Sequence, residues 1–229
     1  VLYAALVETG VISKEEMLTL RQFSSTLEGH PVPRVKGIRV ATGSLGQGLS
    51  IGIGIALAKN FLNTNRRVYV LLGDGEVAEG NVWESINLVG RLRLSNLTAI
   101  LDMNRLGQSG PTMLQWDAES YAKRVAAFDW DVFICDGHDV KELIRVFSEA
   151  KRSDKPSFII AKTVKGKGVS FLENAEGRHG TALSEDELGR AEKEILPKIG
   201  DVDFQPSNYI GATMPVRVRN KFSFQTNYK

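Results

Sequence analysis

The sequence has few of the features that mark secreted or membrane proteins. Cys135 is the single cysteine among 229 residues, so no internal disulfide can form and a reducing compartment suits the chain. The longest apolar stretches, such as residues 49–58 and 68–72, are too short to cross a bilayer and are interrupted by glycine or flanked by charge. We therefore expect a cytoplasmic protein without a membrane partner.

Charge of one sign and clusters of metal-binding histidine or cysteine are also scarce. The 29 basic residues nearly balance the 27 acidic ones, for a net charge of +2, and the basic residues are scattered along the chain. This distribution argues against nucleic acid as a partner. The three histidines and the cysteine do not have the spacing of a zinc site.

Short apolar runs alternate with longer amphipathic stretches, a pattern typical of β-α-β units. The clearest strands are expected at residues 67–72, 97–101, 131–135 and 157–161. Apolar residues recur at helical spacing in residues 45–62, 79–92, 117–128 and 140–151. The expected fold class is therefore α/β, with a mostly parallel sheet covered by helices on both faces.

The length and the pattern predict one main domain over residues 1–200. From about residue 201 the periodicity decays, and prolines, asparagines and a basic stretch predict an extended C-terminal arm over residues 201–229. The chain opens at Val1–Leu6 as if inside a helix, without a capping residue or an initiator methionine, so we infer that natural sequence is missing upstream.

Polar residues follow two consecutive expected strands. Asp74 lies in the Gly-Asp-Gly turn at residues 73–75, and Asn104 follows the next strand, with the backbone carbonyl of Leu106 just beyond it. Because ligands gather beyond the carboxyl ends of parallel strands, these three oxygen donors predict a magnesium site. A simple turn is the alternative for the tripeptide, and Asp102 is expected to orient its own loop.

A glycine-rich loop at residues 42–48 precedes the helix expected from about Leu49. Glycines at this density free backbone amides at a helix N-terminus, where anions or polar rings bind. The loop is not a Walker loop, because no Gly-Lys-Ser/Thr follows it. It is not a dinucleotide-binding fingerprint, because its glycine spacing differs and no strand directly precedes it. Close helix packing at Gly48, Gly52 and Gly54 is an equally consistent interpretation.

The three histidines lie in loops. His30, between Gly29 and Pro31, fits a catalytic or substrate-binding role as well as a plain turn, and His179 lies in a flexible polar loop. His138 is expected to cap or orient the helix that follows it.

Five loops together resemble transketolase in order and spacing, over roughly residues 1–197. They are Gly29–Pro31, Thr42–Gly48, Gly73–Gly75 with Glu79, Gly80 and Glu84, Asp102–Asn104, and Lys162–Gly168 ahead of His179 and Gly180. The version at residues 165–171 is similar to the split transketolases, in which the diphosphate-binding and pyrimidine-binding domains are separate chains.

The resemblance implies a thiamine-diphosphate-binding domain and assigns roles to particular residues. Asp74, Asn104 and the Leu106 carbonyl would hold Mg²⁺, or Ca²⁺ or Mn²⁺ in its place, against the diphosphate of the cofactor. Gly43 and Leu45 would contact the aminopyrimidine or thiazolium ring.

Further residues would complete the cofactor site. Gly73, Gly75 and Glu79 would lie beside the diphosphate and the subunit contact. His30 and His179 would face the reacting sugar and the cofactor phosphates and assist proton transfer. Glu84 is expected only to contribute to an interface.

The reaction implied by the resemblance is transfer of a two-carbon ketol unit from a ketose phosphate to an aldose phosphate, as in the pentose phosphate pathway. In this family a glutamate that activates the aminopyrimidine comes from the other domain. A C-terminal transketolase subunit is thus the implied partner, in a homodimer or heterotetramer, and the chain alone is expected to be incomplete.

Two departures from the family pattern and three alternatives remain. The upstream histidines of the family are absent before Val1, and Lys165 replaces a position that is often apolar. A deoxyxylulose-phosphate synthase or the α-subunit of a 2-oxo-acid dehydrogenase would share the Gly-Asp-Gly turn and the asparagine. A non-catalytic assembly subunit could share the fold.

Overall fold

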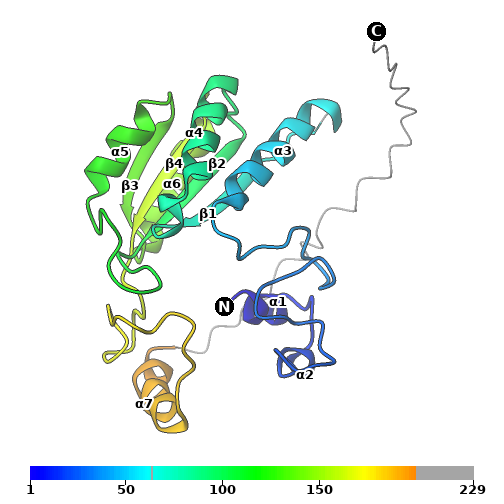
Figure 1. The fold of residues 1–229 in the computed structure, drawn as a ribbon, viewed down its shortest axis with the longest axis vertical. Coiled ribbons are helices and arrows are strands. Elements are labelled where there is room, and N and C mark those ends of the chain that lie inside the picture. The colour runs from blue at the N-terminus through cyan, green and yellow to red at the C-terminus, as the bar shows by residue number, and fades with distance from the viewer. Residues whose placement is uncertain (63, 200–229) are drawn as a thin grey trace. The chain divides into compact units, whose positions relative to one another are not determined.

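The computed structural model describes residues 1–62 and 64–199 and divides them into two compact units that meet in sequence between Gly43 and Ser44. Figure 1 shows the elements of both units along the chain. The arm expected at residues 201–229 lies outside the described residues. The single domain expected over residues 1–200 stays a prediction.

The first unit is small and mostly irregular. It contains α1 (Leu2–Glu8) and α2 (Lys14–Met17), and α2 begins where the side chain of Ser13 accepts a hydrogen bond from the backbone of Glu16. Its buried centre consists of Ile12, Leu27 and Val35, packed against half-buried residues of α1. Residues 2–6 are helical, as the sequence predicted, but the helix begins at Leu2 and residues 1–6 are not its interior.

The second unit contains a four-stranded parallel sheet in the order β1-β2-β4-β3. Its strands are β1 (Val68–Gly73), β2 (Leu97–Met103), β3 (Asp131–Asp136) and β4 (Ser157–Lys162). Each strand starts within one residue of its predicted start. The α/β fold class is confirmed.

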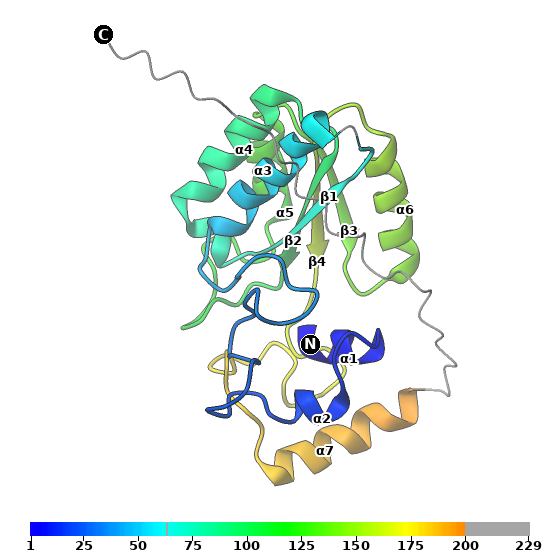
Figure 2. The same ribbon diagram turned by 90° about the vertical axis from the view of Figure 1, so that its right-hand side faces the viewer.

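Helices cover both faces of this sheet, three on one face and one on the other (Figure 2). The first face carries α3 (Gln47–Leu62), α4 (Gly80–Leu92) and α5 (Ala118–Ala126), and the second carries α6 (Val140–Arg152). The side chains of Leu72, Leu101 and Phe158 are fully buried on the first face. Burial stabilises each by roughly 1.5–3 kcal/mol, so the main core lies on this face.

Local signals explain where several helices begin. Asp117 caps α5 by accepting a hydrogen bond from Ser120, and Asp139 caps α6 by accepting from Lys141 and Glu142. His138 was expected to cap or orient this helix, but the capping side chain is that of the next residue.

Short elements complete the second unit. Two are 3₁₀ turns, Glu76–Ala78 and Leu196–Lys198. The third is α7 (Glu185–Ile195), which the periodicity did not reveal. Ser184 and Glu187 form a capping box at its start, and this serine-to-glutamate spacing is readable in the sequence.

The strand register places the four carboxyl ends at one edge of the sheet. Gly73 pairs with Asp102, Asp102 with Ala161, and Asp136 with Lys162. The loops that carry Asp74 and Asn104 therefore begin at one edge of the sheet, as the sequence predicted. Among the described residues, none of the helices is both long and apolar enough to cross a membrane.

Candidate functional site

Asp74 lies immediately beyond β1 and is 3% exposed. Its Oδ1 accepts a hydrogen bond from the backbone N–H of Gly75 at 2.9 Å. Its Oδ2 accepts from the backbone N–H of Arg105 at 2.6 Å and from the Thr112 hydroxyl at 3.2 Å. These bonds join the tip of β1 to the loop after β2.

The electrostatics of Asp74 favour a nearby cation. Burial raises the pKa of this carboxyl, the hydrogen bonds from Arg105, Thr112 and Gly75 oppose the shift, and the charge of Asp102 adds to it. Burial, with the Asp74 charge second, also raises the pKa of Tyr121 to about 12. A bound cation would offset both the desolvation and the repulsion.

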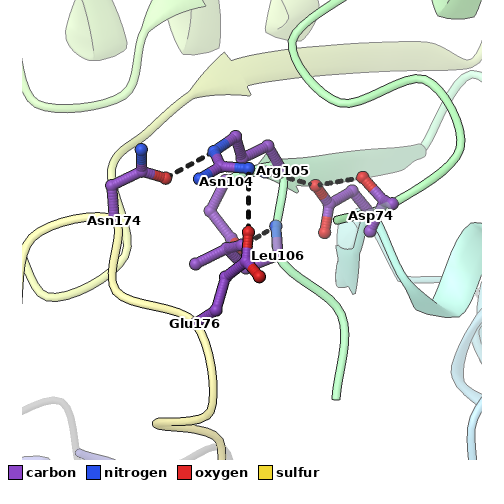
Figure 3. Close-up of polar contacts among 7 residues, drawn as sticks. Asp74, Asn104, Arg105, Leu106, Asn174 and Glu176 are labelled. Atoms are coloured by element: carbon purple, nitrogen blue, oxygen red, sulfur yellow. Dashed lines mark hydrogen bonds and ion pairs between the residues drawn. The ribbon is translucent and has the colours of Figure 1, made fainter. Parts of the chain in front are cut away.

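Asn104 and Leu106 form a tight turn beside this carboxylate. Asn104 Oδ1 accepts a hydrogen bond from the backbone N–H of Leu106 at 3.1 Å, and the intervening Arg105 has a φ of +69°. Figure 3 shows Asp74 beside this turn, joined to it at Arg105. The structure thus brings together the loops that carry the three predicted metal ligands.

Free lone pairs remain on these oxygens. A carboxylate has about four acceptor positions, and Asp74 uses three of them, which leaves one on Oδ1. Asn104 Oδ1 accepts one hydrogen bond, and none from the described residues reaches the backbone oxygen of Leu106. One hard oxygen from each residue is therefore available to a divalent ion.

Asp102 links two strands rather than orienting only its own loop. Its carboxylate accepts a hydrogen bond from the hydroxyl of Thr163, just beyond β4. The backbone oxygen of Thr163 accepts a second hydrogen bond, from the indole of Trp116 at 3.0 Å. Thr163 and Trp116 are therefore supporting residues that sequence reasoning missed.

Glu76 is another residue that sequence reasoning missed. One of its carboxylate oxygens accepts from the backbone N–H of Gly46 at 3.0 Å and the other from that of Gly73 at 3.2 Å. The amide of Asn81 donates to the Gly46 carbonyl at 2.7 Å. The signal was present in the sequence, because Glu76 directly follows the Gly-Asp-Gly turn.

The hydrogen bonds of Glu76 and Asn81 to Gly46 hold the loop at residues 42–48, which is predicted to contact the cofactor rings, close to the Gly-Asp-Gly turn. Gly46 has a φ of +82°, and an added Cβ would lie 2.9 Å from that of Glu79, so only glycine fits. The preceding residue, Leu45, is exposed beside it. Leu45, Gly73, Gly75 and Glu79 are thus held in one connected region of the second unit.

His30 and Gly43 come together within the first unit. A Cβ added at Gly43 would lie 2.5 Å from His30 Cγ, and the φ of Gly43 is +117°. The glycine therefore leaves room for the imidazole, a pairing that a separation of 13 positions in sequence concealed. His30 itself is exposed.

The other two histidines contact the segment after β4. His179 is exposed, and its Nδ1 lies 3.1 Å from Lys165 Nζ. His138 Nε2 accepts a hydrogen bond from the backbone N–H of Val164 at 2.8 Å. His138 therefore orients the chain leaving β4, and His179 stays accessible.

The family model described as transketolase, thiamine diphosphate binding domain, matches residues 1–205. This chain belongs to that family. It is 46% identical over 200 residues to the transketolase of Mus musculus, a match that covers 87% of this chain and 32% of the mouse protein. The chain thus spans about a third of the length of such transketolases.

A shorter relative and a solved structure agree with the transketolase family. One of the subunits of the apulose-4-phosphate transketolase from Phocaeicola vulgatus is 41% identical over 200 residues, a match that covers 86% of this chain and 71% of that polypeptide. The crystal structure of transketolase from Campylobacter jejuni aligns with a TM-score of 0.76 and 34% identity, over 84% of this chain and 32% of that one. Both are homologues, and the second shares the fold.

The residues predicted to hold a metal all offer oxygen atoms as donors. Among the described residues, no group of three or more histidine, cysteine, aspartate or glutamate side chains could hold a metal ion. The donors predicted at residues 74, 104 and 106 are instead a carboxylate, an amide oxygen and a backbone carbonyl. Magnesium completes such partial sets with phosphate oxygens and water.

Proposed function

We propose that this chain is the thiamine-diphosphate-binding part of a transketolase and that it acts with a pyrimidine-binding partner domain or chain. The observation that carries the proposal is the buried Asp74, joined through Arg105 to the loop of Asn104 and Leu106. Family membership over residues 1–205 supports the same cofactor.

Asp74, Asn104 and the Leu106 carbonyl hold a divalent cation, most suitably Mg²⁺, with Ca²⁺ or Mn²⁺ able to replace it. Gly73, Gly75 and Glu79 would approach the cofactor diphosphate from the adjoining turn, where the cation would bind it. Three hydrogen bonds hold the Asp74 carboxylate in one orientation, which reduces the ordering that cation binding requires.

The loop of Gly43 and Leu45 contacts the rings of thiamine diphosphate. Glu76 and Asn81 hold the N–H and the carbonyl of Gly46, and these bonds fix the position of the neighbouring Leu45. When bound, the cofactor supplies the electron sink that carbon–carbon bond cleavage and formation require. The protein contributes binding, orientation and exclusion of water.

His30 and His179 act on the sugar phosphates. A lysine Nζ donates to His179 Nδ1, so the neutral ring carries its proton on Nε2 and presents a hydrogen-bond donor outward. This donor faces a substrate hydroxyl or a cofactor phosphate. His30, with its ring accommodated by Gly43, holds or moves a proton at a substrate hydroxyl.

The substrates are a ketose phosphate that gives a two-carbon ketol unit and an aldose phosphate that accepts it. The name of the P. vulgatus relative, one subunit of an apulose-4-phosphate transketolase, supports both a sugar phosphate substrate and a separate second chain. The single cysteine and the lack of long apolar runs favour the cytoplasm.

The activating glutamate and the rest of the catalytic site come from the partner. The outward face of α4, with exposed Glu84, Leu88 and Leu92, is suited to association in a homodimer or heterotetramer. Glu79 lies just before this helix and contributes to the same contact.

A titration with thiamine diphosphate and Mg²⁺, with and without the pyrimidine-binding chain of a split transketolase, tests the proposal. We expect metal-dependent cofactor binding, and ketol transfer only in the mixture. Transfer by this chain alone would contradict its incompleteness. Absence of cofactor binding in the mixture would favour a non-catalytic assembly subunit.

A further inference from the structure

Arg105 is the central residue of the predicted metal loop, residues 104–106, and its side chain reaches the segment after β4. Its backbone N–H donates to Asp74 Oδ2 at 2.6 Å, and its guanidinium Nε donates to Asn174 Oδ1 at 2.5 Å. Figure 3 shows the side chain extending from the Asp74 side toward Asn174 and Glu176. One residue thus contacts both regions, through different groups.

The guanidinium has further partners and little freedom. It lies 5.5 Å from the centre of the Trp116 ring, and its Nη1 is 3.6 Å from Glu176 Oε1. The Arg105 side chain is 16% exposed, whereas that of Glu176 is 53% exposed. The ion pair is therefore screened by water, and the bond to Asn174 and the stacked indole hold the arginine in place.

The segment that Arg105 holds continues to His179. The backbone N–H of Asn174 donates to the Lys165 carbonyl at 2.8 Å, and Lys165 Nζ contacts His179 Nδ1 at 3.1 Å. A continuous series of contacts therefore runs from Asp74 through Arg105, Asn174 and Lys165 to His179. The first two contacts join residues 31 and 69 positions apart, whereas the last two lie within residues 165–180.

Backbone geometry shows that Arg105 is held at a conformational cost. Its φ of +69° lies in the left-handed region, where asparagine and glycine are favoured and arginine is not. Asn174, at the other end of the bond, has a φ of +56°. Asparagine suits this conformation at position 174. At position 105 an arginine is explained by its long side chain, which reaches Asn174.

We propose that Arg105 is a positioning residue that fastens the His179 segment, residues 165–180, to the metal loop, so that cofactor binding at Asp74 orders the loop carrying Lys165 and His179. The ordering step rests on the proposed function, whereas the fastening step does not require the cofactor.

Hydrogen exchange of the full chain, resolved by mass spectrometry over residues 165–180, tests both steps. The main variant is Arg105→Asn, because asparagine tolerates the positive φ and keeps the backbone N–H that binds Asp74. Arg93→Asn is the matched control, since Arg93 is also an arginine at positive φ but is exposed at the end of α4. Both variants lose the same charge.

Without cofactor, we expect Arg105→Asn to speed exchange in residues 165–180 by roughly tenfold, since local opening governs the rate. The Arg93→Asn variant should match the wild type there. Asn174→Gly should reproduce the Arg105→Asn effect without adding to it in the double variant. Asn174→Asp keeps the acceptor oxygen and should restore protection.

With thiamine diphosphate and Mg²⁺, we expect the wild type to gain protection in residues 165–180. The Arg105→Asn chain should bind the cofactor within a few-fold of the wild-type affinity and yet gain no protection there. A general loss of folding would instead lower the unfolding midpoint and speed exchange in the strands.

Two results would overturn the inference: wild-type exchange in the cofactor-free Arg105→Asn chain, or equal cofactor-induced protection in both proteins. Failure of the wild type to bind cofactor would overturn the proposed function and the ordering step. The cofactor-free comparison would still decide whether Arg105 fastens the segment.

Discussion

The loops after β1 and β2 differ sharply from the segment after β4, although all begin at the same edge of the sheet. Asp74 and Leu106, in the first pair of loops, are 3% and 5% exposed, and backbone amides hold the carboxylate. In the segment after β4, His179 and several neighbours are exposed. Asp74, the proposed anchor for a cation, and an accessible histidine thus occupy separate loops.

The difference follows from what holds each region. Adjacent parallel strands bring the tips of β1 and β2 together, so a backbone N–H of the second loop donates to the buried Asp74 carboxylate of the first. The backbone bonds of the longer segment mostly close its own turns, as from Asn174 N–H to the Lys165 carbonyl, and side-chain contacts such as the ion pair between Arg178 and Glu187 at 2.7 Å join it to α7. Such partly exposed pairs contribute only about 0–1 kcal/mol each. The anchor should therefore stay fixed while the histidine adapts to substrate.

The largest effect should come from removing the anchor. We expect Asp74→Ala to weaken Mg²⁺-dependent thiamine diphosphate binding by more than about 100-fold. Mutating a residue that only hydrogen-bonds a metal ligand typically costs roughly 10- to 100-fold. The fold should survive. Calorimetric titration measures the affinity, and Asp102→Asn, which changes a supporting carboxylate, should lose no more than about tenfold. Unchanged affinity in Asp74→Ala would remove the metal site.

Replacing either histidine should slow turnover and leave cofactor binding largely unchanged. We expect His179→Ala to slow ketol transfer by about 100-fold in the complex with the pyrimidine-binding chain, at the low end of general acid–base effects. Cofactor affinity should change only a few-fold, because the anchor remains intact. Steady-state assays alongside the titration check both quantities. The same split is expected for His30→Ala, and a normal rate would exclude that residue from catalysis.

Two glycines can show how specifically the segment after β4 is folded. Both Gly166 and Gly168 have positive φ, but a Cβ at Gly166 would meet the Leu172 carbonyl oxygen at 2.4 Å, whereas none of the described atoms lies within 4 Å at Gly168. We expect Gly168→Ala to cost about 1 kcal/mol from strain and Gly166→Ala about 2 kcal/mol more from the clash. Urea unfolding measures both. Equal losses of unfolding free energy in the two variants would mean that the backbone around Gly166 moves easily to accommodate a Cβ.

The smallest effect concerns pH. Because burial raises the pKa of Asp74 in the metal-free fold, folding favours its protonated form. The stabilising contribution is present below the unfolded pKa of about 3.9 and is lost as pH rises through the folded pKa. We expect the unfolding free energy of the wild type, relative to Asp74→Asn, to fall over this range. Parallel pH curves for the two proteins would contradict the shift.

The same linkage affects metal binding. A divalent cation requires the ionised carboxylate, so Mg²⁺ affinity should begin to fall at a higher pH than for an ordinary aspartate. Titrations at several pH values measure this onset.

Much of the second unit could be predicted from local pattern. Each of the four strands starts within a residue of its predicted start, because apolar runs ending in glycine or polar residues are local signals. The meeting of the Asp74 and Asn104 loops also followed, since consecutive parallel strands became neighbours. Helix α7 was missed although its capping box was readable, because its sequence is dominated by charged residues and Ala191 is its one buried residue.

Contacts between distant segments could not be predicted in this way. The position of β4 between β2 and β3 brings Asp102 to Thr163, and the path of the following segment brings Asn174 to Arg105, 69 positions away. Neither contact has a local signal.

By itself, the sequence determined the four strands, the four helices that cover them, the family and the residue types at the strand tips, because each depends on neighbours along the chain. Only the tertiary structure decided that Glu76 holds Gly46, that Gly43 accommodates His30, and that Arg105 joins the anchor to the histidine segment. Strand order and loop path depend on burial summed over a whole unit, and no short stretch of sequence contains that sum.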